Sequence, residues 1–146
     1  MNQDLLEVLN NTRFITLSTV NDDGSPWATP IGWFGFDAEN NRIVFDNETG
    51  TIHAANLQRD SRCIITMVNH DKEYTRAVYV PTLAKKLTGE DFEKAKKFLP
   101  DRGVHDENDI FAASIGEINV EKSRIGLVGS GGGMRFYCYM KAREVE

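Results

Sequence analysis

The residues with the clearest chemical potential lie where a polar segment runs into a short helix. Residues 46–51 read DNETGT, and residues 52–59, IHAANLQR, carry apolar positions at helical spacing. The first N–H groups of a helix and the positive end of its dipole both attract anions. Thr49, Thr51 and His53 are therefore candidates for a phosphate cradle.

The same residues fit a simpler interpretation. Threonine is a common N-cap, so Thr51 followed by a surface histidine describes many ordinary helix starts, and the pattern alone favours this alternative. An unperturbed histidine has a pKa near ~6.5 and is mostly neutral at physiological pH, unless a bound phosphate holds the proton on His53. Local pattern leaves both interpretations open.

A second unusual feature lies in the strand expected over residues 26–36, where Pro30 and Gly32 interrupt an aromatic-rich run. Proline lacks an N–H group for the strand ladder, and glycine lacks a side chain for packing. Such residues indicate an edge strand, a bulge or a close approach by a flat ligand. On this argument an edge or a bulge is favoured over a ligand platform.

The elements that must position these residues are mostly strands. Alternating apolar residues and an Asp-Gly turn at residues 22–25 predict a hairpin. We expect short helices over residues 4–9, 52–59 and from Thr88 onward, and strands over residues 14–20, 26–36, 42–45, 61–68, 76–87, 110–120, 123–128 and 134–141. A chain of 146 residues suits one domain, residues 1–146, of mainly β (α+β) class, a small barrel with two or three short peripheral helices.

Composition excludes several functions. The net charge of −5 lacks the clustered bases of a nucleic-acid binder, and no apolar run approaches the length of a membrane span. Cys63 and Cys138 are expected to be buried free thiols, and the scattered histidines imply no metal site. The glycines at 129 and 131–133 precede a strand pattern, so they predict a hairpin loop rather than a nucleotide loop. We expect a cytoplasmic protein without nucleic-acid or membrane partners.

The order of these elements resembles a known family. The run FITLSTVNDDGSPWATPIGWFGFD, followed by NRIVFDN and IHAANLQRDSRCIITMVN, is similar to the pyridoxamine 5'-phosphate oxidase-like, FMN-binding split-barrel family. The similarity covers residues 10–90, and the last third of the chain matches only by strand pattern. It implies a homodimeric, Greek-key split β-barrel with FMN in a groove between the subunits.

The resemblance also implies which residues approach the cofactor. On one side are backbone groups of the second strand that would face the isoalloxazine, namely Thr29, Pro30 and Ile31. On the other side are residues that would approach the ribityl phosphate, namely Asn47, Thr49, Thr51 and His53. The resemblance assigns no side chain as a catalytic acid or base.

Two departures from the family shape the functional expectation. His53 stands where the family often has a phosphate-binding lysine, and the C-terminus lacks the arginine- and proline-containing substrate motif of true pyridoxamine phosphate oxidases. The resemblance therefore implies a small FMN-dependent oxidoreductase acting on an unidentified small molecule, rather than vitamin B6 oxidation. The alternatives are a flavin- or haem-binding or stress protein without turnover, and a deazaflavin-binding or cofactor-free member of the fold.

Overall fold

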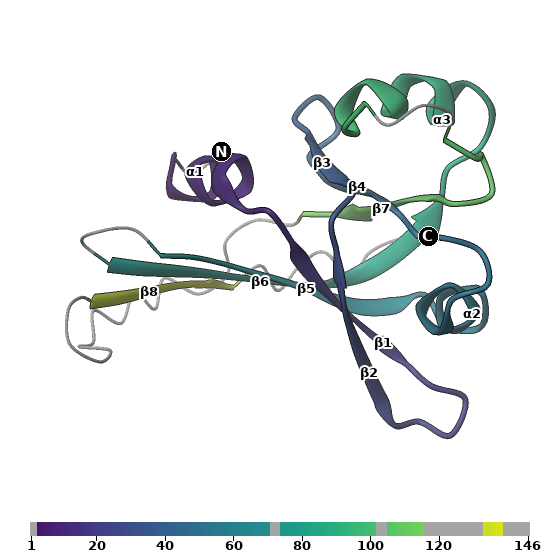
Figure 1. Cartoon of the computed structure of the whole chain (residues 1–146), viewed down its shortest axis with the longest axis horizontal. Helices are drawn as coiled ribbons and strands as arrows, with labels where there is room; N and C mark the ends of the chain where they lie inside the picture. Colours follow the sequence, from purple (N-terminus) through teal and green to yellow (C-terminus); the bar gives the residue numbers. More distant parts are fainter. Residues whose placement is uncertain (1–2, 71–73, 102–104, 116–132, 139–146) are drawn as a thin grey trace.

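The strands of this protein form one curled sheet with short helices around it (Figure 1). The computed structural model describes residues 3–70, 74–101, 105–115 and 133–138. Its helices are α1 (Gln3–Asn11), α2 (Ile52–Arg59) and α3 (Gly89–Ala95), followed by the 3-10 turn η1 (Lys96–Phe98). Its strands are β1 (Ile15–Val20), β2 (Pro26–Ile31), β3 (Phe34–Asp37), β4 (Arg42–Asp46), β5 (Arg62–His70), β6 (Tyr74–Lys86), β7 (Ile110–Ser114) and β8 (Gly133–Cys138).

The strand order confirms the predicted mainly β split barrel. Neighbours along the path β2-β1-β5-β6-β7-β4-β3 are all antiparallel, and β8 lies parallel to β6. The long strand β6 pairs with β5 through residues 75–83 and with β7 through residues 84–86. Because β6 takes part in both halves, the sheet curls into a half-barrel.

The single strand expected over residues 26–36 is wrong, because the chain bends at Gly32 and Trp33. Residues before the bend pair with β1, with Ile31 opposite Ile15, whereas residues after it pair with β4, with Phe34 opposite Phe45. The preference for an edge is confirmed among the described strands, since β2 ends their order and Pro30 is exposed. The missing N–H group of Pro30 costs little at an edge.

Two buried clusters lie on opposite faces of β4. Ile43 and Phe45 face the main core, which is built from the inner faces of β1, β5 and β6 and from Leu57 of α2. Val44 faces a second cluster formed with α3. A strand covered on both faces explains the uninterrupted apolar run from Ile43 to Phe45. Figure 1 shows α3 over the end of the sheet formed by β3, β4 and β7.

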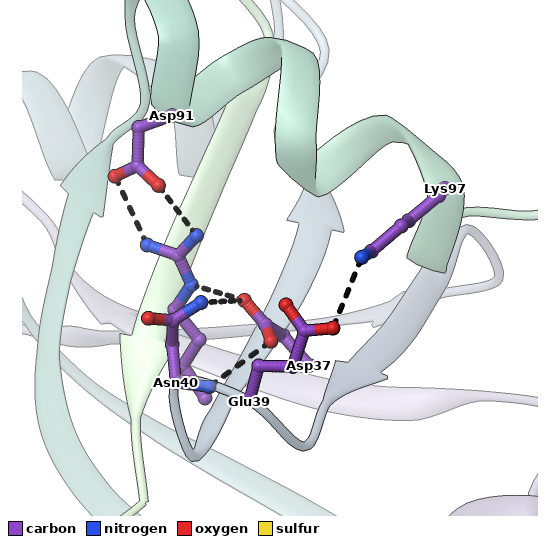
Figure 2. A network of polar contacts seen from close by, with 6 residues as sticks. Asp37, Glu39, Asn40, Asp91 and Lys97 are labelled. Carbon is purple, nitrogen blue, oxygen red and sulfur yellow. Dashed lines mark hydrogen bonds and ion pairs between the residues drawn. The ribbon is translucent and has the colours of Figure 1, made fainter.

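A polar network ties α3 to the sheet (Figure 2). The Asp37 carboxylate, whose side chain is fully buried, accepts hydrogen bonds from Asn40 and from Arg42 Nε at 2.8 Å. The guanidinium of Arg42 also donates two hydrogen bonds to Asp91 of α3. Burial alone would raise the pKa of Asp37, but the hydrogen bonds from Asn40 and Arg42 hold that pKa below its usual value.

Several other expectations can be compared with the described residues. Cys63 is a buried free thiol as expected, and burial raises its pKa to about 12. None of the described helices is both long and apolar enough to cross a membrane. Across residues 3–70, 74–101 and 105–115 with 133–138, the His, Cys, Asp and Glu side chains form no cluster suited to a metal ion. The strand expected over 123–128 and most of the glycine loop lie outside the described residues.

Candidate functional site

A small cavity lies beside the bend between β2 and β3. Its volume is about 180 Å³. It is lined by residues of the bend, the end of β4 and the start of α2, namely Pro30, Ile31, Gly32, Trp33, Asp46, Glu48 and His53. The backbone N–H of Asp46 donates to the Trp33 carbonyl over 2.9 Å and holds two of these segments together. The bend and the chain that follows β4 therefore build the cavity jointly.

His53 enters this cavity from the first turn of α2. Thr51 is the N-cap, and its hydroxyl accepts a hydrogen bond from the N–H of Ala54 at 3.2 Å, as the sequence pattern predicted. The alternative of a surface histidine is wrong, because His53 is only 8% exposed. Its Nδ1 lies 2.5 Å from Oδ1 of Asn47, which is itself buried.

The surroundings of His53 favour its neutral form. Desolvation by burial lowers its pKa below the ordinary 6.5, and the negative charge of Glu48 acts in the opposite direction. An amide oxygen only accepts hydrogen bonds, so the contact with Asn47 places the proton of the neutral ring on Nδ1. Nε2 then carries a lone pair. It has no hydrogen-bond partner within the described part of the chain, while His53 lines the cavity.

The hydroxyls expected to bind phosphate are already engaged. Thr49 donates its hydroxyl and its backbone N–H to the carboxylate of Asp109, at 2.5 and 2.9 Å. The Thr51 hydroxyl donates to the Glu48 carbonyl at 2.7 Å while it caps α2. Neither residue lines the cavity. The structure therefore groups His53 with Asn47, but not with the two threonines.

The three residues expected to face a flavin ring lie on the edge strand β2. Pro30 and Ile31 line the cavity, and Thr29 lies one position before them, opposite Leu17 of β1. Ile31 is 6% exposed and its side chain belongs to the main core, next to the cavity. Ile31 can therefore offer a ligand its backbone rather than its side chain, whereas Pro30 is exposed and has no N–H group to donate.

Sequence reasoning missed the acidic part of the site. Asp46 and Glu48 line the cavity, although the segment that holds them was treated only as a polar connection. His105 lies far along the chain from this segment, yet its side chain is 6% exposed and its Nδ1 lies 3.8 Å from the Asp46 carboxylate. The sequence does offer one signal for Asp46, namely its position at the end of a strand and shortly before the start of a helix. No local signal could bring His105 there, because 59 positions separate it from Asp46.

A second hollow adjoins the cavity at the same bend. It has a volume of about 540 Å³ and is lined by Arg13, Phe14, Gly32 and Trp33. Phe14 is 60% exposed and Trp33 is 42% exposed. Cavity and hollow share Gly32 and Trp33. The bend therefore carries aromatic surface between a polar cavity and a hollow that contains the cation Arg13.

These features fit the ring of FMN, but they do not fit its phosphate in the predicted place. The exposed rings and the edge-strand backbone suit a flat heterocycle. The predicted phosphate cradle does not fit. Asp46 and Glu48 line the cavity beside a neutral His53, and none of the described residues that line it is a lysine or arginine. Among the described residues, Arg13 brings a cation to the adjoining hollow.

A known protein family matches most of the chain. The family model described as pyridoxamine 5'-phosphate oxidase matches residues 1–125. Among curated proteins, none matches the chain.

Solved structures share the fold at low identity. A haem-binding protein from Mycobacterium smegmatis superposes with a TM-score of 0.62 at 20% identity, over 72% of this chain and 47% of that chain. A putative 5-nitroimidazole antibiotic resistance protein from Bacteroides thetaiotaomicron gives 0.61 at 13% identity, over 77% of this chain and 78% of the other. A structure titled F420 reductase gives 0.51 at 20% identity, over 73% and 86%. The chain thus spans under half of the mycobacterial chain, and these likenesses concern the fold alone.

Proposed function

Because the chain belongs to the pyridoxamine 5'-phosphate oxidase family, we propose that it is a small flavin-binding oxidoreductase that holds a cofactor of the FMN class against the Gly32–Trp33 bend. The observation that carries the proposal is the meeting of the cavity and the aromatic hollow at this bend. The substrate is an unidentified small molecule.

The bend offers what a planar ring needs. Trp33 and Phe14 expose large apolar surfaces, and exposed aromatic groups beside a hollow are typical of ligand sites. Gly32 keeps the bend thin, because a Cβ atom there would lie 3.3 Å from the Phe14 ring. A bound flavin would supply hydride or electron transfer, while Phe14 and Trp33 orient the ring and Arg13 attracts an acidic group.

A haem-binding function is the second candidate, and His53 is the observation that favours it. Neutral imidazole is a common axial ligand of haem iron, and Nε2 of His53 has the free lone pair that such a bond needs. A structural neighbour is titled as a haem-binding protein. The same proposal extends to a deazaflavin, since one structural neighbour is an F420 reductase.

Titration of the purified protein with FMN, riboflavin and haemin tests these candidates. We expect quenching of flavin fluorescence, and at least a tenfold loss of flavin affinity in Trp33→Ala because ring stacking contributes on the order of 1–3 kcal/mol. Trp27→Ala is the control, since Trp27 is similarly exposed and lines neither space. Absence of flavin binding together with a haemin Soret shift that His53→Ala removes would favour the haem candidate.

We also propose that the chain forms a homodimer through the outer face of the sheet. Ser18 pairs with Ala28 and with Ile64, and Ile64 pairs with Pro81, so these side chains share one face. β1 and β2 contain no charged residue, in a chain that is 27% charged. Ile64 is 43% exposed and lines a groove of about 470 Å³ on this face. Of the described residues that line this groove, Arg62 alone is charged, and a largely uncharged surface of this kind is typical of interfaces.

Light scattering tests the dimer. Ile64→Lys should convert a dimer into a monomer, because an ammonium group would be buried without a partner. Gln58→Lys, at an exposed position on α2, adds the same charge and should leave the dimer intact. A monomeric unmodified protein would contradict the proposal. A cytoplasmic location stays a prediction from the sequence.

A further inference from the structure

We propose that the cavity beside the Gly32–Trp33 bend binds a positively charged nitrogen group of a small molecule, an ammonium or a guanidinium, through Nε2 of His53 and the carboxylate of Glu48. This goes beyond the proposed function, because it assigns the ligand chemistry of a space that a phosphate was expected to fill. The cation belongs to the substrate or to another second ligand, and the flavin ring occupies the adjoining aromatic hollow.

The charge of the lining is the first argument. Asp46 and Glu48 line a space of about 180 Å³, and the described residues around it include no lysine or arginine. Asp46 is 5% exposed, so solvent screens its charge poorly. Such a lining repels phosphate and attracts a cation.

The second argument is the acceptor that His53 presents. Its residue surface is more than nine-tenths buried, and Asn47 occupies Nδ1. The remaining nitrogen, Nε2, has no partner among the described residues and belongs to a side chain that lines the cavity. A lone pair in this position accepts a hydrogen bond, so it selects a ligand that donates one. Ammonium and guanidinium groups are donors without acceptors.

Size and aromatic surface complete the argument. The volume of about 180 Å³ lies below the roughly 300–1,000 Å³ of pockets that enclose a whole small ligand, so it suits a head group and not a whole cofactor. Trp33 lines the same cavity, and the face of an indole ring attracts cations. Hydrogen-bond acceptance, negative charge and an aromatic wall thus favour the same ligand class.

Nuclear magnetic resonance of the full chain with ¹⁵N-labelled histidine and tryptophan tests the proposal. At pH 7.5 we expect the proton of His53 on Nδ1. Methylguanidinium should shift the signals of His53 Nε2 and of the Trp33 indole, whereas inorganic phosphate at the same concentration should shift neither. Glu48→Gln should weaken methylguanidinium binding at least fivefold. Glu90→Gln, on the exposed face of α3, should leave it unchanged.

Three results would overturn the assignment. They are a proton on Nε2 of His53, a response to phosphate without a response to methylguanidinium, and an equal effect of Glu48→Gln and Glu90→Gln. Folding is not at risk in either variant, because both glutamates are exposed. Riboflavin titration of the same samples keeps the two proposals separate. Flavin binding without methylguanidinium binding would refute only this inference, and the reverse result would refute only the flavin proposal.

Discussion

Two polar clusters of the molecule are built from similar residues but differ in how completely they are satisfied. At the α3 corner, the buried Asp37 carboxylate is bonded by Asn40 and Arg42, and Arg42 is bonded in turn by Asp91 (Figure 2). At the cavity, Nδ2 of Asn47 is buried without a hydrogen-bond partner, and Nε2 of His53 has none among the described residues.

The difference separates a structural role from a binding role. A buried polar group without a partner costs free energy, so a fold tends to complete every bond where the cluster only holds elements together. The Asp37 corner follows this rule and attaches α3 to the sheet. The His53 cluster leaves hydrogen-bonding capacity next to a cavity, where a ligand can use it.

The largest expected effect tests the structural cluster. Arg42→Met should lower the free energy of unfolding by about 3–5 kcal/mol, because it leaves the carboxylate of Asp37 buried without its cation. Urea unfolding measures this change. Lys97→Met is the control, since it removes an exposed ion pair with Glu39 in the same region and should cost at most about 1 kcal/mol. Equal losses in both variants would show that the corner is not a special structural cluster.

The next effect concerns the glycine that lets η1 approach the sheet. A Cβ atom at Gly35 would lie 1.6 Å from the Phe98 carbonyl oxygen, so η1 would have to move away from β3. Gly35→Ala should therefore destabilise the protein by about 3 kcal/mol, the upper part of the usual range for overpacking. Thermal unfolding checks this, and a melting temperature equal to that of the unmodified protein would contradict the close packing.

The cluster around His53 and the cluster around Asp37 should lose their contributions to stability over different pH ranges. The pKa of His53 is lowered by burial from 6.5, so the unfolded chain binds a proton before the folded chain does. The contribution of His53 to the free energy of unfolding is therefore complete above pH 6.5. It is lost as the pH falls from 6.5 through the pKa of His53 in the folded protein. The pKa values of Asp37 and Asp91 both lie below 3.8. Burial would raise the pKa of Asp37, but its hydrogen bonds outweigh that effect, and the hydrogen bond from Arg42 is the main cause for Asp91. The contribution of these two carboxylates to the free energy of unfolding is lost only as the pH falls below 3.8.

Urea unfolding between pH 2.5 and pH 8 measures this difference, since the contributions of Asp37 and Asp91 are lost only below pH 3.8. His53→Gln should flatten the change just below pH 6.5 and leave the decline at lower pH in place. An unchanged profile in His53→Gln would show that another group causes the loss.

The smallest effect on stability is expected at the bend itself. A Cβ atom at Gly32 meets only the exposed ring of Phe14, which is free to move by the few tenths of an ångström required. Gly32→Ala should change the free energy of unfolding by less than about 0.5 kcal/mol, as ordinary surface substitutions do. It should nevertheless reduce flavin affinity, because the methyl group occupies surface at the bend. A loss of stability as large as in Gly35→Ala would contradict the assignment of this bend to binding.

Local pattern predicted the elements well and their junctions poorly. The helix at residues 52–59, its cap Thr51 and the edge position of Pro30 follow from propensities that act over a few residues. The break at Gly32 was missed, because a glycine inside a strand pattern does not show that the next residues pair with a different strand. The Trp33–Asp46 hydrogen bond makes that junction, and its two residues are distant in the chain.

The sequence by itself determined the family, the strand and helix order, and the position of His53 in the first turn of a capped helix. Only the tertiary structure decided that His53 is buried against Asn47, that Thr49 and Thr51 bond elsewhere, and that two carboxylates share the cavity with it. The physical reason is that helix and strand formation depend on near neighbours. The protonation and charge of a site depend on desolvation and on groups that the fold brings together from distant segments.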